Sequence, residues 1–329
     1  GEMTSLVVND GGWCQATHQS LLRAMKELGI PKKNLITIEN VSEDQTSVQN
    51  AYNALVGDNV NLIIGASSGY APFLSDLAKQ NPDIMVAQNG NKANNLIGYQ
   101  IKNYEGMFEA GYVSELLSHS NLLGFAASMP EASVRAAANG YALGAKYANP
   151  NVKVQLIWNN TWYNVDTETQ SAKTLINKGI KYMAMEASSP ALPQTAESNG
   201  AFCIGYNVDM QKLAPKAVLT SFEWNFTPIF KKIIKTTSQG TASTKDYYYE
   251  GGDCAKLADF NSALVPQDIQ EQAKKVKADI DSGKIKIYGG ELKDNKGNVL
   301  VPAGKTMSTD KIIKQNFVVA NITGEMKSY

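Results

Sequence analysis

The chain has 329 residues, of which 43% are hydrophobic, so it can bury a sizeable core, and its length favours two domains over one. Its 31 lysines and arginines balance its 31 aspartates and glutamates, and no block of like charge stands out. This balance excludes the basic footprint of a nucleic-acid or anionic-membrane partner, so we expect small or neutral partners.

The number and spacing of the cysteines, the small number of arginines and the short apolar runs exclude further classes of protein. Cys14, Cys203 and Cys254 are too few and too scattered for a disulfide framework or a zinc site, and we expect neither a metal nor a cofactor. Arg23 and Arg135 are the only arginines, which leaves few bidentate clamps for a phosphate or carboxylate ligand. No apolar run reaches the roughly 18 residues needed to span a bilayer.

The first 28 residues predict a strand, a glycine turn and a helix. An apolar run at 5–8 is followed by Asn-Asp-Gly-Gly at 9–12 and then by apolar residues at helical spacing over 21–28. Open α/β sheets bind small ligands at such corners, beyond the carboxyl end of a strand and against a helix N-terminus. Trp13 offers a flat stacking face there, where a phosphate site would have small residues.

The same alternation continues along the chain. Further strands are predicted at 35–38, 62–65, 84–87, 96–99, 122–126, 152–158, 182–185, 202–205 and 217–221. Helical patterns separate most of them, at 48–56, 73–77, 104–112, 131–147, 165–178 and 190–199. A strand at 247–250, a helix at 266–283 and a hairpin around 294–297 follow. Two runs of β-α units predict an α/β fold with two Rossmann-like lobes and mainly parallel sheets.

The loops that leave the predicted strands are rich in aromatic, amide and hydroxyl side chains and poor in charge. They lie at 66–70, 158–163, 186–190, 205–209 and 222–225. Such a lining suits a flat, neutral ligand that forms hydrogen bonds.

With these loops, the chain resembles the basic membrane protein family of bacterial ABC-transporter substrate-binding lipoproteins, which includes the purine nucleoside receptors. It is most similar to a subgroup whose first loop reads Gly-Trp-x-x-x-His, matched by Gly12, Trp13 and His18. Further matches, in order, are Asn160-Thr161-Trp162-Tyr163, Ser188-Ser189-Pro190-Ala191, Ile204-Gly205-Tyr206 with Asp209-Met210, Ala214-Pro215-Lys216-Ala217 and Val301-Pro302-Ala303-Gly304-Lys305.

The resemblance implies a type I periplasmic-binding-protein fold, in which two lobes close around the ligand. Lobe one is expected to comprise 4–120 with about 225–246, and lobe two 121–221 with about 252–288, while the lobe of 289–329 stays open. The hinge is expected to cross near 119–121, 222–225 and 247–252. The family also implies an ABC permease partner, an extracytoplasmic location, and a lipid anchor upstream of this sequence; we expect a monomer.

Departures from the family pattern bear on the ligand. Nucleoside-binding members are expected to carry an aspartate where this chain has Asn207 and a lysine where it has Trp224. Those charged groups suit ribose hydroxyls, so their replacement by an amide and an indole favours a free purine base. Gln19 stands where the subgroup usually has an aspartate, which bears on the orientation of His18 or the identity of the base.

The predicted ligand-binding residues are Asp10, Trp13, His18, Ser67, Trp162, Ser188, Tyr206, Asn207, Asp209 and Trp224. Trp13 and the other indoles have core packing as their alternative role. Asp10 and Asp209 have helix capping or an Asx turn as theirs. Cys14 and His18, one helical turn apart, allow a second reading as a thiol-imidazole pair.

These observations predict a non-enzymatic, extracytoplasmic binding protein that captures a purine nucleobase for an ABC transporter. A purine nucleoside receptor of the same family is the alternative. A ligand sensor with a signalling partner and a Cys-His hydrolase complete the alternatives.

Overall fold

The computed structural model describes residues 1–90 and 92–324. The chain forms two compact units, and each contains its own sheet. The first unit comprises Gly1–Ile101 and Trp224–Glu250. The second comprises Lys102–Glu223 and the chain from Gly251 onward. The predicted α/β class with mainly parallel sheets is confirmed.

The sheet of the first unit has six strands in the order β11-β5-β4-β3-β1-β2. Its strands are β1 (Glu2–Met3), β2 (Thr37–Ile38), β3 (Leu62–Gly65), β4 (Met85–Asn89), β5 (Ile97–Ile101) and β11 (Tyr247–Glu250). All its neighbouring pairs are parallel. Parallel neighbours require crossover connections, which explains why helices separate most of the strands in the sequence.

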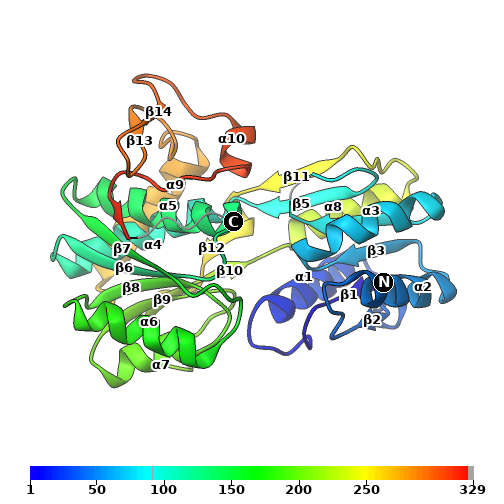
Figure 1. Cartoon of the computed structure of the whole chain (residues 1–329), viewed down its shortest axis with the longest axis horizontal. Helices are drawn as coiled ribbons and strands as arrows, with labels where there is room; N and C mark the ends of the chain where they lie inside the picture. Colours follow the sequence, from blue (N-terminus) through cyan, green and yellow to red (C-terminus); the bar gives the residue numbers. More distant parts are fainter. Residues whose placement is uncertain (91, 325–329) are drawn as a thin grey trace. The chain divides into compact units, whose positions relative to one another are not determined.

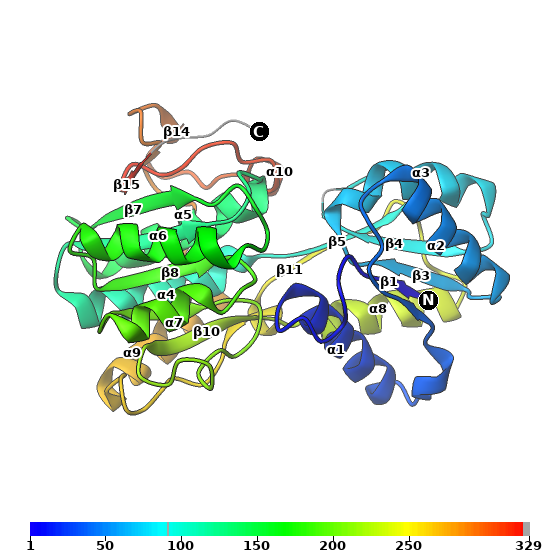
Figure 2. The same cartoon turned by 60° about the horizontal axis from the view of Figure 1, so that its bottom comes forward.

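Four helices cover this sheet: α1 (Trp13–Glu27), α2 (Gln45–Gly57), α3 (Ala71–Gln80) and α8 (Thr227–Ser238). The connection from β1 to β2 runs one way along the sheet, and those from β2 to β3 and from β3 to β4 run the other way. Right-handed crossovers therefore place α1 on one face and α2 with α3 on the other. Figure 2 shows this division, with α8 beside α1.

The core of the first unit lies between the sheet and helices α2 and α3. It is built from aliphatic and aromatic side chains that include Met3, Val48, Tyr52, Leu55 and Ile63, all fully buried. Helix α2 enters this core in a fixed register because Asp44 caps it, accepting the backbone N–H of Ser47 at 2.9 Å.

The sheet of the second unit has seven strands in the order β12-β10-β9-β8-β6-β7-β15. Its strands are β6 (Leu122–Ala127), β7 (Lys153–Trp158), β8 (Tyr182–Glu186), β9 (Phe202–Gly205), β10 (Val218–Trp224), β12 (Ala255–Leu257) and β15 (Ile322–Thr323). A separate antiparallel hairpin, β13 (Leu292–Lys293) and β14 (Val299–Val301), matches the hairpin predicted from the turn at 294–297.

The helices of the second unit are α4 (Asn103–Ser118), α5 (Ala132–Ala148), α6 (Val165–Asn177), α7 (Ala191–Ser198), α9 (Gln267–Asp281) and α10 (Thr309–Ile313). Figure 1 shows α4 and α5 on one face of the sheet and α6 and α7 on the other. The crossovers explain this division, because β6 connects to β7 in one direction while β7 to β8 and β8 to β9 run in the opposite direction.

Helices α4 and α5 pack backbone against backbone. A Cβ atom added at Gly144 would lie 1.8 Å from the carbonyl oxygen of Phe108, and one at Gly111 would lie 1.9 Å from that of Tyr141. Only glycine allows so close an approach, so these positions hold α4 and α5 together.

The structure corrects the predicted first strand. The apolar run at 5–8 is not a strand, and Leu6 and Val7 are 42% and 38% exposed. The strand is instead β1, where Met3 is fully buried and pairs with Ile38 and Gly65. Tertiary pairing thus overrides the local apolar pattern.

The first unit has a division at Ile101, and α4 packs against α5 and belongs to the second unit. The predicted lobe bounds stay a prediction. The hinge positions stay a prediction. Of the C-terminal segment 289–329, the last five residues lie outside the described residues. Among the described residues, no helix is long and apolar enough to cross a bilayer.

Candidate functional site

The strand order of the first unit identifies a ligand-binding edge. Strand β1 lies between β2 and β3, and the connections from β1 and β3 leave in opposite directions. In open α/β sheets, ligands bind at such a switch point, beyond the carboxyl ends of the two strands. Trp13 spans this point, because its indole Nε1 donates a hydrogen bond to the carbonyl oxygen of Ala66, directly after β3, at 2.5 Å.

The indole of Trp13 also belongs to an aromatic cluster. Its ring packs edge-on against Trp224 at 5.2 Å and against Phe226 at 5.4 Å between centroids. Trp224 and Phe226 are stacked, with ring planes 6° apart. Trp13 is half-buried whereas Trp224 is only 5% exposed. Trp13 therefore keeps accessible ring surface, and Trp224 serves mainly as its support in this unit.

Asp10 caps helix α1. Its Oδ1 accepts the backbone N–H groups of Gly12 at 2.8 Å and Gln15 at 3.0 Å, and its Oδ2 accepts that of Cys14 at 3.2 Å. A helix N-terminus leaves such donors unpaired, and a carboxylate satisfies both their hydrogen bonding and the helix dipole. Asp10 thus takes the capping role that was the alternative to ligand binding.

His18 is buried, and its Nδ1 lies 2.6 Å from Oε2 of Glu2. Thr37 donates a hydrogen bond to the same carboxylate oxygen at 3.1 Å. Glu2 is fully buried at the start of β1, so its carboxylate holds the ring of His18 in one orientation. This contact explains how His18 is oriented without an aspartate at position 19.

The thiol of Cys14 is not paired with His18. Its Sγ contacts the hydroxyl of Ser5 at 3.7 Å. Burial, together with the charge of Asp10, raises the pKa of Cys14 to about 11. A nucleophilic thiol needs the opposite shift, so the geometry does not support the Cys-His alternative.

Ser67 lies at the same edge, in the loop after β3. Its hydroxyl donates a hydrogen bond to Oε1 of Glu43, and its carbonyl accepts one from the amide of Gln88. Ser67 is 8% exposed, so this second loop is held by its own side-chain contacts.

The second unit has an equivalent switch point between β6 and β8, because β6 connects toward β7 and β8 toward β9. Ser128 follows β6 directly, and Glu186 is the last residue of β8. The hydroxyl of Ser128 donates to Oε2 of Glu186, and its backbone N–H donates to the carbonyl of Glu186 at 2.9 Å. Burial raises the pKa of the Glu186 carboxyl to about 7.

Three of the predicted site residues meet beside this switch point. The side-chain amide of Asn207 donates to the carbonyl of Ala187 at 3.2 Å and to the hydroxyl of Ser188 at 3.3 Å. The backbone N–H of Ser188 donates to the carbonyl of Trp162 at 3.2 Å. Trp162 is 39% exposed, so its indole is accessible while its backbone is anchored.

Tyr206 and Asp209 have structural contacts. Tyr206 is fully buried, stacks on Phe222 with centroids 4.9 Å apart, and accepts a hydrogen bond from Asn103 at 3.0 Å. Asp209 is exposed and accepts the backbone N–H of Gln211 at 2.9 Å, which is an Asx turn.

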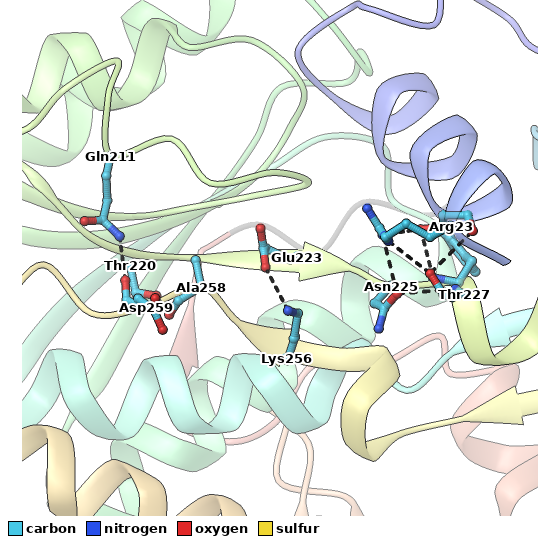
Figure 3. A network of polar contacts seen from close by, with 11 residues as sticks. Arg23, Gln211, Thr220, Glu223, Asn225, Thr227, Lys256, Ala258 and Asp259 are labelled. Carbon is cyan, nitrogen blue, oxygen red and sulfur yellow. Dashed lines mark hydrogen bonds and ion pairs between the residues drawn. The ribbon is translucent and has the colours of Figure 1, made fainter. Parts of the chain in front are cut away.

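Both arginines of the chain have structural contacts. Figure 3 shows Arg23, whose guanidinium donates to Thr227 at 3.2 Å and to Asn225 at 3.5 Å and so joins α1 to the start of α8. Arg135 donates to the carbonyl of Pro130 and lies over the ring of Trp158 at 5.6 Å.

Separately, Figure 3 shows the edge of the second sheet. Thr220 of β10 donates to the carbonyl of Ala258 at 2.7 Å, and Glu223 pairs with Lys256 at 3.5 Å. These contacts hold β12 and the residue that follows it against β10.

Glu2, Glu43, Ser128 and Glu186 are not among the ligand-binding residues predicted from the sequence. A signal was present for Glu186, since a single acid closes the buried apolar run of β8. The hydrogen-bond partners of the other three residues lie between 16 and 58 residues away along the chain, so no local sequence pattern predicts these contacts.

Comparison with known proteins identifies the family. Residues 3–290 match the family described as ABC transporter substrate-binding protein PnrA-like. The purine-binding protein BAB2_0673 of Brucella abortus is 28% identical over 96% of this chain and 90% of its own length. The transcriptional activator protein med of Bacillus subtilis is 26% identical over 88% of each chain. Basic membrane protein B of Borreliella afzelii is 26% identical over 76% of this chain and 75% of its own.

Solved structures agree on the fold. A solute-binding protein of an ABC transporter system from Conexibacter woesei superposes with a TM-score of 0.69 at 17% identity, over 86% of this chain and 96% of that one. A transcriptional activator of the comK gene from Bacillus halodurans superposes with a TM-score of 0.73 at 20% identity, over 86% and 98%.

Proteins of this family are extracytoplasmic solute-binding proteins rather than enzymes, and they hand a small molecule to a permease. The family match covers both units, and the fold has the type I periplasmic-binding-protein arrangement of strands. The chain belongs to the basic membrane protein family of PnrA-like ABC transporter substrate-binding proteins.

Proposed function

We propose that this protein captures a purine nucleobase and delivers it to the permease of an ABC transporter. The observation that supports this proposal is the kind of side chain that each switch point presents. One presents the indole of Trp13, and the other presents hydroxyl, amide and carboxyl groups at Ser188, Asn207 and Glu186. A flat, uncharged heterocycle with donors and acceptors on its rim complements these groups. The relative from Brucella abortus, named a purine-binding protein, supports the same ligand class.

Two features favour a base over a nucleoside. The amide of Asn207 is held by Ala187 and Ser188, and Trp224 is packed on Phe226. Neither is a charged group suited to ribose hydroxyls. Both arginines have structural partners, which agrees with a ligand that lacks a phosphate.

Within this proposal, Trp13 and Trp162 supply stacking surface, and His18, Ser67, Ser188 and Asn207 supply polar contacts. Asp10, Tyr206, Asp209 and Trp224 support the site from their capping, turn or packing positions. The lipid anchor and the monomeric state stay predictions.

Isothermal titration calorimetry tests the proposal with adenine, guanine, hypoxanthine, xanthine and the corresponding nucleosides, with glucose as an unrelated ligand. We expect bases to bind and to bind more tightly than nucleosides. Silence across the purine panel contradicts the proposal. Tighter binding of nucleosides contradicts only the preference for bases.

A ligand sensor is the second candidate, favoured by the similarity to the transcriptional activator protein med. Reconstituted transport separates the two functions. Uptake of a bound purine by vesicles that contain the cognate permease, dependent on this protein, supports transport, and absence of such uptake favours the sensor.

A further inference from the structure

The switch point of the second unit has a buried carboxyl at the end of one of its two strands. Glu186 closes β8, is 8% exposed, and is held by the hydroxyl of Ser128 at the end of the neighbouring β6. These two strands are the pair from which the connections diverge. The edge of an open α/β sheet at this point is where a ligand contacts the strand ends.

Other carboxylates near the strand ends are already committed. Asp10 caps α1 through three backbone N–H groups, and Asp209 closes an Asx turn. Glu168 accepts the backbone N–H of Asn164 at 3.2 Å and the hydroxyl of Ser189 at 2.7 Å. The contacts given for the Glu186 carboxyl come from the hydroxyl and backbone N–H of one residue, Ser128, so among these described acids it keeps the most acceptor capacity.

The surroundings of Glu186 disfavour its charge. Burial is the main cause that raises its pKa to about 7, and the charges of Glu131, ahead of α5, and Glu168, in α6, raise the pKa further. The hydroxyl and backbone N–H of Ser128 act in the opposite direction. Tyr206, after β9, also faces this carboxyl, and its phenol stays neutral because burial and the charge of Glu186 raise its own pKa. Near neutral pH the carboxyl therefore exchanges between its two forms.

The two forms have different hydrogen-bonding patterns. A neutral carboxyl offers one O–H donor beside an acceptor, and a carboxylate offers only acceptors. Purine bases differ in the same way along one edge. Adenine presents a ring nitrogen acceptor beside an amino donor, and guanine presents a ring N–H donor beside an amino donor.

We propose that Glu186 reads the hydrogen-bonding edge of the bound base, its neutral form selecting an adenine-type edge and its charged form a guanine-type edge. The proposal rests on the purine capture proposed above and assigns its specificity to one side chain. A mismatched form leaves buried polar groups unpaired, which a binding site penalises strongly.

The pH dependence follows from this pairing. The apparent dissociation constant rises as the binding-competent fraction falls, so adenine affinity falls about tenfold between about pH 6 and about pH 8. Guanine affinity rises by about the same factor over the same interval. Both affinities change around the pKa of the carboxyl, about 7, and the two curves cross at that pH where the two bases bind their preferred forms equally tightly.

Calorimetry with adenine and guanine across this pH range tests the proposal on the wild type and three variants. Glu186→Gln mimics the neutral acid, so it binds adenine without pH dependence and loses at least about tenfold in guanine affinity at high pH. Glu109→Gln is the matched control. Glu109 is also buried in the second unit, with a pKa raised to about 8 by burial, but it lies in α4 away from the strand ends. This control keeps the wild-type curves.

Ser128→Ala provides a second test should Glu186→Gln not fold, as judged by its thermal unfolding. Loss of the hydroxyl donor removes a contact that favours the carboxylate, so the crossing point moves to higher pH. Wild-type curves in Glu186→Gln, or an unmoved crossing in Ser128→Ala, overturn the proposal while purine capture stands. A wild type that binds no purine overturns purine capture itself, and this inference with it.

Discussion

The two switch points of this protein are built from the same strand arrangement but from different chemistry. In the first unit, the Asp10 carboxylate caps a helix and Glu2 orients the His18 imidazole, beside the half-buried indole of Trp13. In the second unit, the Glu186 carboxyl is held by Ser128 and the Asn207 amide by Ala187 and Ser188, beside the exposed indole of Trp162. Within the proposed function, this difference predicts that the aromatic surface of the first unit contributes to affinity and the polar groups of the second contribute to specificity.

The largest expected effect is a loss of stability in the second unit when the packing of α4 against α5 is disturbed. Gly144→Ala places a methyl group against the backbone of Phe108, and such overpacking costs about 1–3 kcal/mol or more of unfolding free energy. Chemical denaturation measures this loss. Gly57→Ala, at a helical glycine of the first unit with open space around it, is the control and leaves stability unchanged or slightly raised. Equal losses in both variants contradict the close packing of α4 and α5.

Removal of the indole plate tests the affinity side. Trp13→Ala weakens every purine that binds by a similar factor, because stacking contributes about 1–3 kcal/mol for each base and tolerates any base. Trp13→Phe keeps a stacking face and loses only the hydrogen bond to Ala66, so it retains more of the affinity. Calorimetry across the purine panel compares the two. A change in the order of preference among bases shows instead that Trp13 contributes to specificity.

The capping role of Asp10 predicts a smaller effect. Asp10→Ala leaves three backbone N–H groups at the start of α1 without their acceptor and costs about 0.5–2 kcal/mol of stability. Asp10→Asn keeps a cap oxygen and most of the stability. Thermal unfolding of the two variants without ligand measures this difference. Two variants as stable as the wild type, with weakened purine binding, would mean that Asp10 contacts the ligand.

Cys14 is expected to give the smallest effect. Because burial raises its thiol pKa to about 11, Cys14 reacts slowly with iodoacetamide in the folded protein at mildly alkaline pH. Cys14→Ser keeps purine binding. Mass spectrometry of intact protein after timed alkylation measures the rate. Rapid modification of Cys14 would restore the thiol-imidazole reading that the geometry disfavours.

The sequence correctly predicted the elements that have a long repeating pattern of apolar residues or a clear glycine boundary. The helix expected at 266–283 is α9 (Gln267–Asp281), and the glycine turn before Trp13 correctly predicted a helix start. The first strand was wrong because an apolar run, however regular, becomes a strand only where neighbours pair with it. Glu2 reads as a polar flank in the sequence, yet its pairing with Thr37 and Ile64 places it inside the sheet, between β2 and β3.

The candidate site was predictable at the level of loops but not of individual contacts. Asp10 and Glu186 are both acids near predicted strand ends, and only the structure reveals that Asp10 caps a helix while Glu186 is held by a serine 58 residues away. Asn207 and Ser188 were identified from their loops, and their contact depends on how two crossovers bring those loops together.

The backbone at Asn207 has an evolutionary consequence. Its φ of 73° lies in the left-handed region, which asparagine, aspartate and glycine adopt at low cost and β-branched residues avoid. The residues that this position tolerates at low cost are therefore asparagine, aspartate and glycine. A lineage of such proteins has a short path between a neutral and a charged side chain at this position, since one exchange alters the chemistry and keeps the same backbone conformation.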